Sequence, residues 1–216
     1  MKKIAFFAML LGFFLFMGGT KALAVNEENP FLIEINLDQH LLVVYENGEQ
    51  VLSYAIAIGK PSTPSPLGEY RIVSKQVSWG DGFGTRWMGL NVPWGSYGIH
   101  GTNRPSSITQ SVSHGCIRLH NADVEELYSI VPLGTRVSII GQTWRIVEPT
   151  AGLKRGDSGQ EIVFLQQKLN AIGFWAGFAD GYYGDMTESA VKYFQSMHYL
   201  PQTGIADQEV LSLLYP

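Results

Sequence analysis

The sequence predicts a mainly β domain followed by a small helical domain, and three observations lead to this fold class. Apolar and β-branched runs separated by turn residues dominate residues 31–147, as is typical of strands. Beyond residue 152, apolar residues recur every three or four positions, which predicts amphipathic helices. The two patterns meet at Glu148-Pro149-Thr150-Ala151-Gly152, where proline and glycine indicate a linker.

The β region contains six apolar and β-branched runs that predict strands, at residues 31–35, 41–45, 51–58, 68–77, 136–140 and 143–147. Asn47-Gly48 between two of these runs predicts a hairpin turn. Three prolines within residues 61–66 predict a rigid loop, because proline fixes its backbone φ angle. One helix is expected over residues 121–131, with Asn121 as its N-terminal cap.

The helical region predicts three helices. The first is expected to end at Gly173, because glycine favours helix C-termini. Thr187 is expected to cap the second helix and Asp207 the third. Their apolar stripes comprise Ile162, Leu165, Leu169 and Ile172, then Val191, Phe194 and Met197, then Val210, Leu211 and Leu214.

The first 24 residues have the features of a signal peptide. Lys2 and Lys3 precede an apolar run at residues 4–17, and Ala22-Leu23-Ala24 supplies the small residues of a cleavage site. The alternative is a membrane anchor, for which this run is short, because a spanning helix needs about 20 apolar residues. Cleavage leaves 12 basic and 19 acidic residues, a formal charge of −7. That charge argues against nucleic acid and membrane surfaces as partners.

Cys116 is the only cysteine of the chain and lies in Ser113-His114-Gly115-Cys116-Ile117-Arg118. A thiol with nearby imidazoles is sufficient for nucleophilic acyl transfer. The general base is either His114, which would share a side with Cys116 in an extended segment, or His100, which would approach from another segment. Backbone N–H groups at Gly115 and Cys116 are expected to face a developing oxyanion.

Two other interpretations of this thiol remain open. A lone cysteine beside a glycine is often a buried small hydrophobic residue. A zinc site would have to combine His100, His114, Cys116 and His120, whose spacings match no compact ligand pair. The sequence therefore favours catalysis and predicts no metal site.

The segments Ile99-His100-Gly101-Thr102 and Val112-Ser113-His114-Gly115-Cys116-Ile117-Arg118-Leu119 resemble the signature of the L,D-transpeptidases, which have a YkuD-type catalytic domain. Further similar blocks at residues 63–70, 83–88 and 131–135 occur in the family's order, so the resemblance covers about residues 31–141. It implies a β-sandwich-like domain with mixed sheets that requires no cofactor.

The resemblance also implies roles for individual residues. Cys116 would be the nucleophile and His100 the general base, with the Gly101 carbonyl orienting the imidazole. His114 and Gly115 would shape the oxyanion region.

Arg118 occupies a position where a common form of the motif has asparagine, and it either binds a carboxylate or supports the loop. Trp94 and Tyr97 precede His100 closely in the sequence and are expected to line the substrate cleft. The glycine-rich segment 79–84 is expected to form either a mobile lid or an ordinary hairpin.

The family's chemistry implies that the thiolate attacks the carbonyl of the third residue in a peptidoglycan tetrapeptide stem and releases the terminal D-alanine. An amine of another stem, or water, then resolves the thioester. The predicted function is an exported L,D-transpeptidase. The alternatives are an L,D-carboxypeptidase-type hydrolase with the same thioester and a non-catalytic wall-binding protein.

The helical region resembles the type 1 peptidoglycan-binding domain over about residues 153–214, for example in Asp180-Gly181-Tyr182-Tyr183-Gly184. The resemblance implies binding to the glycan wall, with Asp180, Tyr182 and Tyr183 as candidate contacts, by a module expected to fold alone and act as a tether. The expected organisation of this cell-wall protein is a signal peptide at 1–24, a catalytic domain at 31–141, a final strand and linker at 142–152, and a peptidoglycan-binding domain at 153–214.

Overall fold

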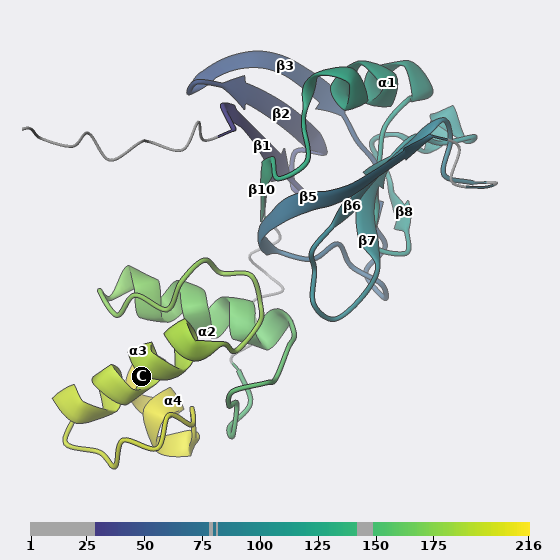
Figure 1. The fold of residues 1–216 in the computed structure, drawn as a ribbon. Helices are drawn as coiled ribbons and strands as arrows, with labels where there is room; N and C mark the ends of the chain where they lie inside the picture. Colours follow the sequence, from purple (N-terminus) through teal and green to yellow (C-terminus); the bar gives the residue numbers. More distant parts are fainter. Residues whose placement is uncertain (1–28, 78–79, 81, 142–148) are drawn as a thin grey trace, which may run out of the picture.

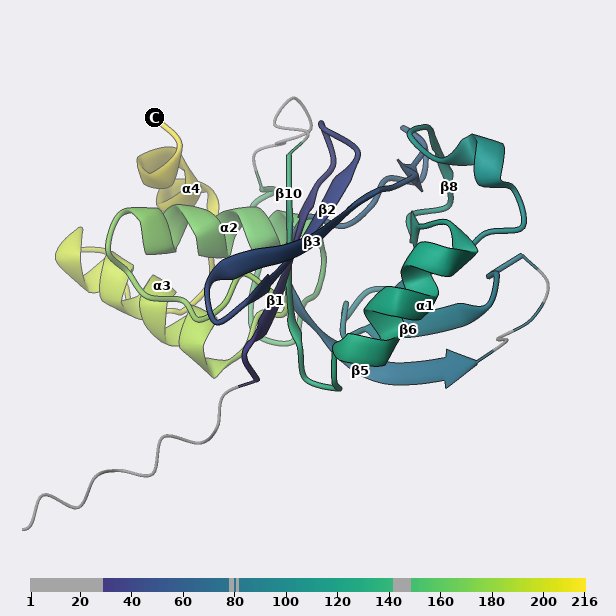
Figure 2. The ribbon, with the colours of Figure 1, turned by 90° about the horizontal axis from the view of Figure 1, so that it is seen from above.

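The computed structural model describes residues 29–77, 80, 82–141 and 149–216. Its strands are β1 (Phe31–Asn36), β2 (Leu41–Glu46), β3 (Glu49–Ala55), β4 (Ile58–Gly59), β5 (Gly68–Val77), β6 (Arg86–Leu90), β7 (Tyr97–His100), β8 (Ser111–Ser113), β9 (Ile117–Arg118) and β10 (Arg136–Ile140). Its helices are η1 (Pro105–Ser107), α1 (Asn121–Ile130), α2 (Gln160–Ala171), α3 (Asp185–Met197) and α4 (Gln208–Leu214). Figures 1 and 2 show α2, α3 and α4 gathered on one side of the sheet, while α1 lies with the strands.

The β domain is built on one curled, mixed sheet with the strand order β3-β2-β1-β10-β5-β6-β7-β9 (Figure 1). The pairs β1–β10 and β7–β9 are parallel, and the other neighbours within this sheet are antiparallel. Strands β4 and β8 form a separate parallel pair. The prediction of a mainly β domain with mixed pairing is therefore confirmed.

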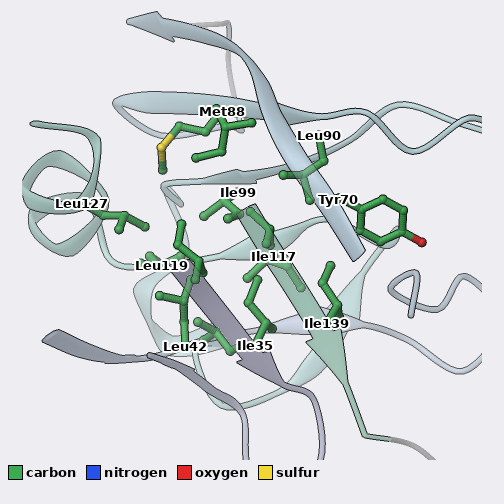
Figure 3. Packing of buried hydrophobic residues seen from close by; sticks show 14 of the residues in the cluster. Ile35, Leu42, Tyr70, Met88, Leu90, Ile99, Ile117, Leu119, Leu127 and Ile139 are labelled. Carbon is green, nitrogen blue, oxygen red and sulfur yellow. The ribbon is translucent and has the colours of Figure 1, made fainter. Parts of the chain in front are cut away.

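The apolar core of the β domain packs against the strands that carry the candidate site. Ile99 of β7 and Ile117 of β9 are register partners and are 0% and 1% exposed. Figure 3 shows them among core residues from distant strands, such as Ile35 and Ile139. Leu127 of α1 closes this core and is fully buried. The residues next to Ile99 and Ile117 are thus held at fixed positions by packing.

Most predicted strands of the β region agree with the structure to within one or two residues. The hairpin at Asn47-Gly48 is confirmed, with φ angles of 52° and 84° that suit a type I′ turn. The predicted strand 51–58 is divided into β3 and β4. The predicted strand 143–147, Trp79, Asp81 and the proposed signal peptide lie outside the described residues.

Two of the three predicted helix caps are wrong. His120 precedes α1, and the Asn121 side chain instead accepts a hydrogen bond from the Thr85 N–H at 3.3 Å. Thr187 lies inside α3 and is buried. Its hydroxyl accepts a hydrogen bond from Gln166 and donates one to the Ala176 carbonyl, so it is not free to cap the helix. Asp207 does cap α4, accepting from the backbone N–H groups of the second and third helical residues.

The helical module has a core of its own that joins α2, α3 and α4, for example through Leu165, Val191 and Leu211. Its α2 nevertheless also contributes Phe164, 5% exposed, to the core of the β domain. The two parts of the chain therefore share packed apolar surface. Within the described residues, no helix is long and apolar enough to cross a membrane.

Candidate active site

The loop that carries Cys116 lies between β8 and β9 and is held by one serine. Ser113 Oγ donates to the Cys116 carbonyl at 2.6 Å and accepts from the Gly115 N–H at 3.0 Å. Because Ser113 is fully buried, both hydrogen bonds are shielded from water. The turn before Cys116 is therefore closed by the Ser113 side chain, to which the sequence pattern assigns no role.

Gly115 is required at this turn for two independent reasons. Its φ angle is +115°, a conformation that L side chains rarely adopt. A Cβ atom at this position would also lie 2.6 Å from the Tyr97 ring and 3.2 Å from the Pro64 carbonyl oxygen. Only glycine lets the loop pass this close to Tyr97.

Strand pairing brings His100 beside Cys116. His100 ends β7 and is the register partner of Arg118 in the parallel strand β9, and Cys116 directly precedes that strand. Register partners of adjacent strands share a face of the sheet, as do alternate residues of one strand. His100, Cys116 and Arg118 accordingly line one cavity of about 500 Å³.

The His100 imidazole is held rigidly by its neighbours. It is 2% exposed, stacks on Trp87 at a centroid distance of 5.6 Å and meets the edge of Phe83 at 4.9 Å. Its Nδ1 lies 2.5 Å from the Gly101 carbonyl oxygen. Since a carbonyl can only accept, the ring proton belongs on Nδ1, and Nε2 keeps its lone pair.

Glycines behind His100 make room for Asn121. A Cβ atom on either Gly84 or Gly101 would lie 2.2 Å from Asn121 Oδ1. The Asn121 side chain thus packs against both glycines, next to the carbonyl that orients His100. This explains why Asn121 is placed at the start of α1 without capping it.

Burial sets the protonation of both groups. Desolvation lowers the pKa of His100 to about 4, against the opposing effect of its backbone hydrogen bonds. Burial also raises the pKa of the Cys116 thiol, while a hydrogen bond from Gly98 and the charge of Arg118 lower it in part. The resting pair at neutral pH is consequently a thiol beside a neutral imidazole.

The sequence-predicted residues fall into two neighbouring cavities. Cys116, His100, His114 and Arg118 line the 500 Å³ cavity together with Gly82, Phe83, Trp87 and Ser96. Trp94 and Tyr97 line a second cavity of about 320 Å³ with Ser62, Thr63, Pro64, Ser65, Pro66, His114 and Gln160. His114 is exposed and lines both. Gly101 and Gly115 support these walls without being part of them.

The Cys116 thiol and the Arg118 side chain add two polar features to the cavity. The Cys116 thiol donates a weak hydrogen bond to the Ser96 carbonyl over 4.0 Å. Arg118 Nε is buried and has no hydrogen-bond partner among the described residues.

Within the same residues, no group of three or more His, Cys, Asp and Glu side chains is placed to hold a metal ion. His120, the fourth member of the zinc alternative, is exposed at the start of α1.

In the helical module, one of the predicted wall contacts is wrong. Tyr183 is fully buried, and its hydroxyl donates to the Gly204 carbonyl. Tyr182 is 48% exposed and lines a cavity of about 230 Å³ with Asp180 and Phe178. Tyr182 forms a bridge with Ser158, and the Gly184 N–H donates to the Tyr182 carbonyl across Tyr183, so the chain turns between the exposed and the buried tyrosine.

The curled mixed sheet and its cysteine–histidine cavity define a class of catalytic domain, which sequence comparison identifies. Residues 30–139 match the family model of the L,D-transpeptidase catalytic domain, and residues 158–214 match that of the peptidoglycan binding domain. The chain therefore belongs to the L,D-transpeptidase family and carries a C-terminal peptidoglycan-binding domain.

Relatives with this catalytic domain include two from Bacillus. The chain is 52% identical over 110 residues to the L,D-transpeptidase YkuD of Bacillus licheniformis and 46% identical to that of Bacillus subtilis. Each match covers 51% of this chain and 66% of the relative. Among solved structures, the catalytic domain of the Enterococcus faecium L,D-transpeptidase is 26% identical with a TM-score of 0.46, covering 53% of this chain and 99% of that one.

Proposed function

We propose that this chain is an exported L,D-transpeptidase that cross-links peptidoglycan through a thioester on Cys116. The donor is a tetrapeptide stem, the acceptor is an amine of a second stem, and the released product is D-alanine. Thiol and imidazole supply the nucleophile and the base, so this reaction needs no cofactor. The N-terminal features of a signal peptide and the C-terminal peptidoglycan-binding domain support action in the cell wall.

The proposed reaction has two acyl-transfer steps. His100 Nε2 takes the Cys116 proton as Sγ attacks the carbonyl of the third stem residue. The resulting tetrahedral intermediate breaks its bond to the D-alanine nitrogen, which receives the proton from the imidazolium. The acceptor amine then attacks the thioester, loses a proton to Nε2 and expels the thiolate, which is reprotonated.

The observation that carries this proposal is the hydrogen bond between His100 Nδ1 and the Gly101 carbonyl, in the cavity that also contains Cys116. It orients the ring with Nε2 as the acceptor for a thiol proton. The Gly115 N–H is already bonded to Ser113 Oγ. The Cys116 N–H is therefore the proposed donor to the oxyanion, and Gly115 acts by shaping the turn.

Product analysis tests the function. The full chain is incubated with purified disaccharide-tetrapeptide fragments, and the products are identified by mass spectrometry. We expect cross-linked dimers and free D-alanine from the wild type, and neither from Cys116→Ala. Tripeptide without dimers would identify a hydrolase, and unchanged fragments in the presence of bound wall would identify a binding protein.

A further inference from the structure

The helical module contacts the β domain through a side chain that pairs with both backbone polar groups of a single residue, Leu67. Gln160 Oε1 accepts from the Leu67 N–H at 2.8 Å, and Gln160 Nε2 donates to the Leu67 carbonyl at 3.2 Å. Leu67 is 5% exposed, so its N–H would be desolvated without a partner if Gln160 were lost. The first residue of α2 thus completes the hydrogen bonding of a buried segment of the catalytic domain.

Leu67 ends the loop that holds the nucleophile segment. In this loop, Thr63 Oγ1 donates to the Ser113 carbonyl at 3.1 Å, and the Lys60 N–H donates to the same oxygen at 3.0 Å. Ser113 in turn fixes the Cys116 turn through its hydroxyl. Because residues 61–66 contain three prolines, the loop is stiff, and a shift at one end is transmitted to the other.

The same loop and Gln160 form walls of the 320 Å³ cavity. His114 belongs to this cavity and to the cavity of Cys116. The module therefore reaches the surroundings of the nucleophile both through the loop and through a shared cavity wall.

The rest of the contact between the two parts is closely fitted. The Glu69 N–H donates to the Ala179 carbonyl at 2.9 Å. A Cβ atom on Gly181 would lie 2.2 Å from the Trp94 ring, so this glycine admits the tryptophan. Together with Phe164 in the catalytic core, these contacts hold α2 in one position against the β domain.

We propose that Gln160 of the peptidoglycan-binding module is a positioning residue for Cys116, acting through Leu67 and the proline-rich loop. This inference rests on the proposed function and assigns the module a second role beside wall binding. The module then couples its own docking to the geometry of the nucleophile.

The test compares Gln160→Leu with Gln167→Leu in the full chain, since Gln167 lies exposed on the same helix. With soluble tetrapeptide donor, we expect Gln160→Leu to lower kcat about tenfold, the rate equivalent of losing one buried hydrogen bond, with little change in KM. Binding to wall sacculi should be unchanged. Gln167→Leu should match the wild type in every measurement.

Alkylation of Cys116 by iodoacetamide gives a readout that does not depend on acyl transfer, because Cys116 is the only cysteine. A loosened turn exposes the thiol and relieves the burial that raises its pKa, so Gln160→Leu should be alkylated faster while it transfers more slowly. A wild type that makes no dimers would refute the proposed function, whereas alkylation would still report the position of the thiol. Equal kcat and equal alkylation rates for both variants would refute the role of Gln160.

Gln160→Glu separates hydrogen bonding from space filling. The introduced carboxyl still accepts from the Leu67 N–H. When it is ionised, its second oxygen faces the Leu67 carbonyl oxygen, and the two acceptors repel each other. Protonation restores a donor. The activity of Gln160→Glu relative to the wild type should therefore rise as the pH falls from 8 to 5. A ratio that is independent of pH, with intact thermal unfolding, would contradict the proposal.

Discussion

The His100–Cys116 pair rests in its neutral form, and this determines how the thiol is activated. Burial lowers the pKa of the imidazole to about 4 and raises that of the thiol. A preformed thiolate–imidazolium pair would need the opposite order of pKa values. The proton is therefore expected to leave Cys116 only as the substrate carbonyl is attacked, and the rigid stacking of His100 on Trp87 keeps Nε2 in place for that event.

Arg118 modulates the thiol through its charge. We predict that Arg118→Gln slows the alkylation of Cys116 at neutral pH, because the positive charge near the thiol lowers its pKa. The measurement is the pH dependence of iodoacetamide labelling. Arg104→Gln, which removes an equal charge from an exposed position outside the cavity lining, should leave the profile unchanged. Identical profiles for both variants would show that Arg118 does not act electrostatically.

His100 also makes the stability of the protein depend on pH. Its pKa is about 4 when folded, against an ordinary value of 6.5. Between pH 6.5 and 4 the unfolded chain takes up a proton that the folded protein does not, so the free energy of unfolding falls as the pH falls through this window. Above pH 6.5 His100 is neutral in both states, and its contribution to the free energy of unfolding, on the order of 3 kcal/mol, is fully present.

Denaturant unfolding of wild type and His100→Gln at pH 7 and pH 4.5 measures this contribution. Carboxylates titrate alike in both proteins and cancel in the comparison. We expect the wild type to lose more stability than the variant over this interval. Equal losses in the two proteins would mean that His100 is not desolvated in the folded state.

At the scale of single elements, the turn between β8 and β9 combines a positive φ at Gly115 with close packing. We predict that Gly115→Ala abolishes transfer, because the added methyl group would meet the Tyr97 ring in a conformation already unfavourable for alanine. Gly134→Ala is the matched control, since its φ is +83° and nothing lies within 4 Å of the added Cβ. The control should cost about 1 kcal/mol and leave turnover intact.

Both variants are compared by thermal unfolding and by turnover of the soluble donor. If Gly115→Ala were no more damaging than Gly134→Ala, the Tyr97 contact would have no part in shaping the turn.

Local sequence signals predicted the elements that are marked by alternating apolar residues or by turn residues at their ends. The strand Gly68–Val77 and the turn at Asn47-Gly48 agree with the structure because alternation and a two-residue turn are local properties. Strands β6 and β7 were not predicted, because their five and four residues are nearly all buried and show no alternation. The caps at Asn121 and Thr187 failed because tertiary hydrogen bonds used those side chains instead.

The candidate site could be predicted only in part for the same reason. The Cys116 motif is contiguous, so the sequence alone indicates the nucleophile. The choice of His100 over His114 as the general base came from the family resemblance and not from spacing. The contributions of Asn121 and Gln160 depend on contacts between segments far apart in the sequence. No local pattern signals such contacts.

At the scale of the whole molecule, the peptidoglycan-binding domain is docked rather than loosely tethered. The sequence predicts a module that folds alone and acts as a tether, and independent folding stays a prediction. In the structure, α2 shares Phe164 with the catalytic core and pairs Gln160 with Leu67. The peptidoglycan-binding domain and the catalytic domain are thus joined in one packed unit.

Deletion of residues 150–216 measures the consequence. The truncation uncovers the Leu67 N–H and removes Phe164 from the core, which by itself is worth roughly 3–5 kcal/mol for a buried phenylalanine. We predict a lower melting temperature for the remaining domain and about tenfold slower transfer on soluble fragments. A truncated protein as stable and as active as the full chain would contradict this prediction and would support a module that acts only as a tether.

The central claim is that Cys116 carries the acyl group and that His100 activates it. The most direct measurement is the intact mass of the protein after brief exposure to a soluble tetrapeptide donor, followed by mapping of the adduct. The wild type should gain the mass of the tripeptide acyl group on the peptide containing Cys116, and Cys116→Ala should gain none. His100→Ala should acylate roughly 10²–10⁴-fold more slowly, and His120→Ala at the normal rate. Cross-linked dimers formed by Cys116→Ala, or equal mild losses in the two histidine variants, would contradict the claim.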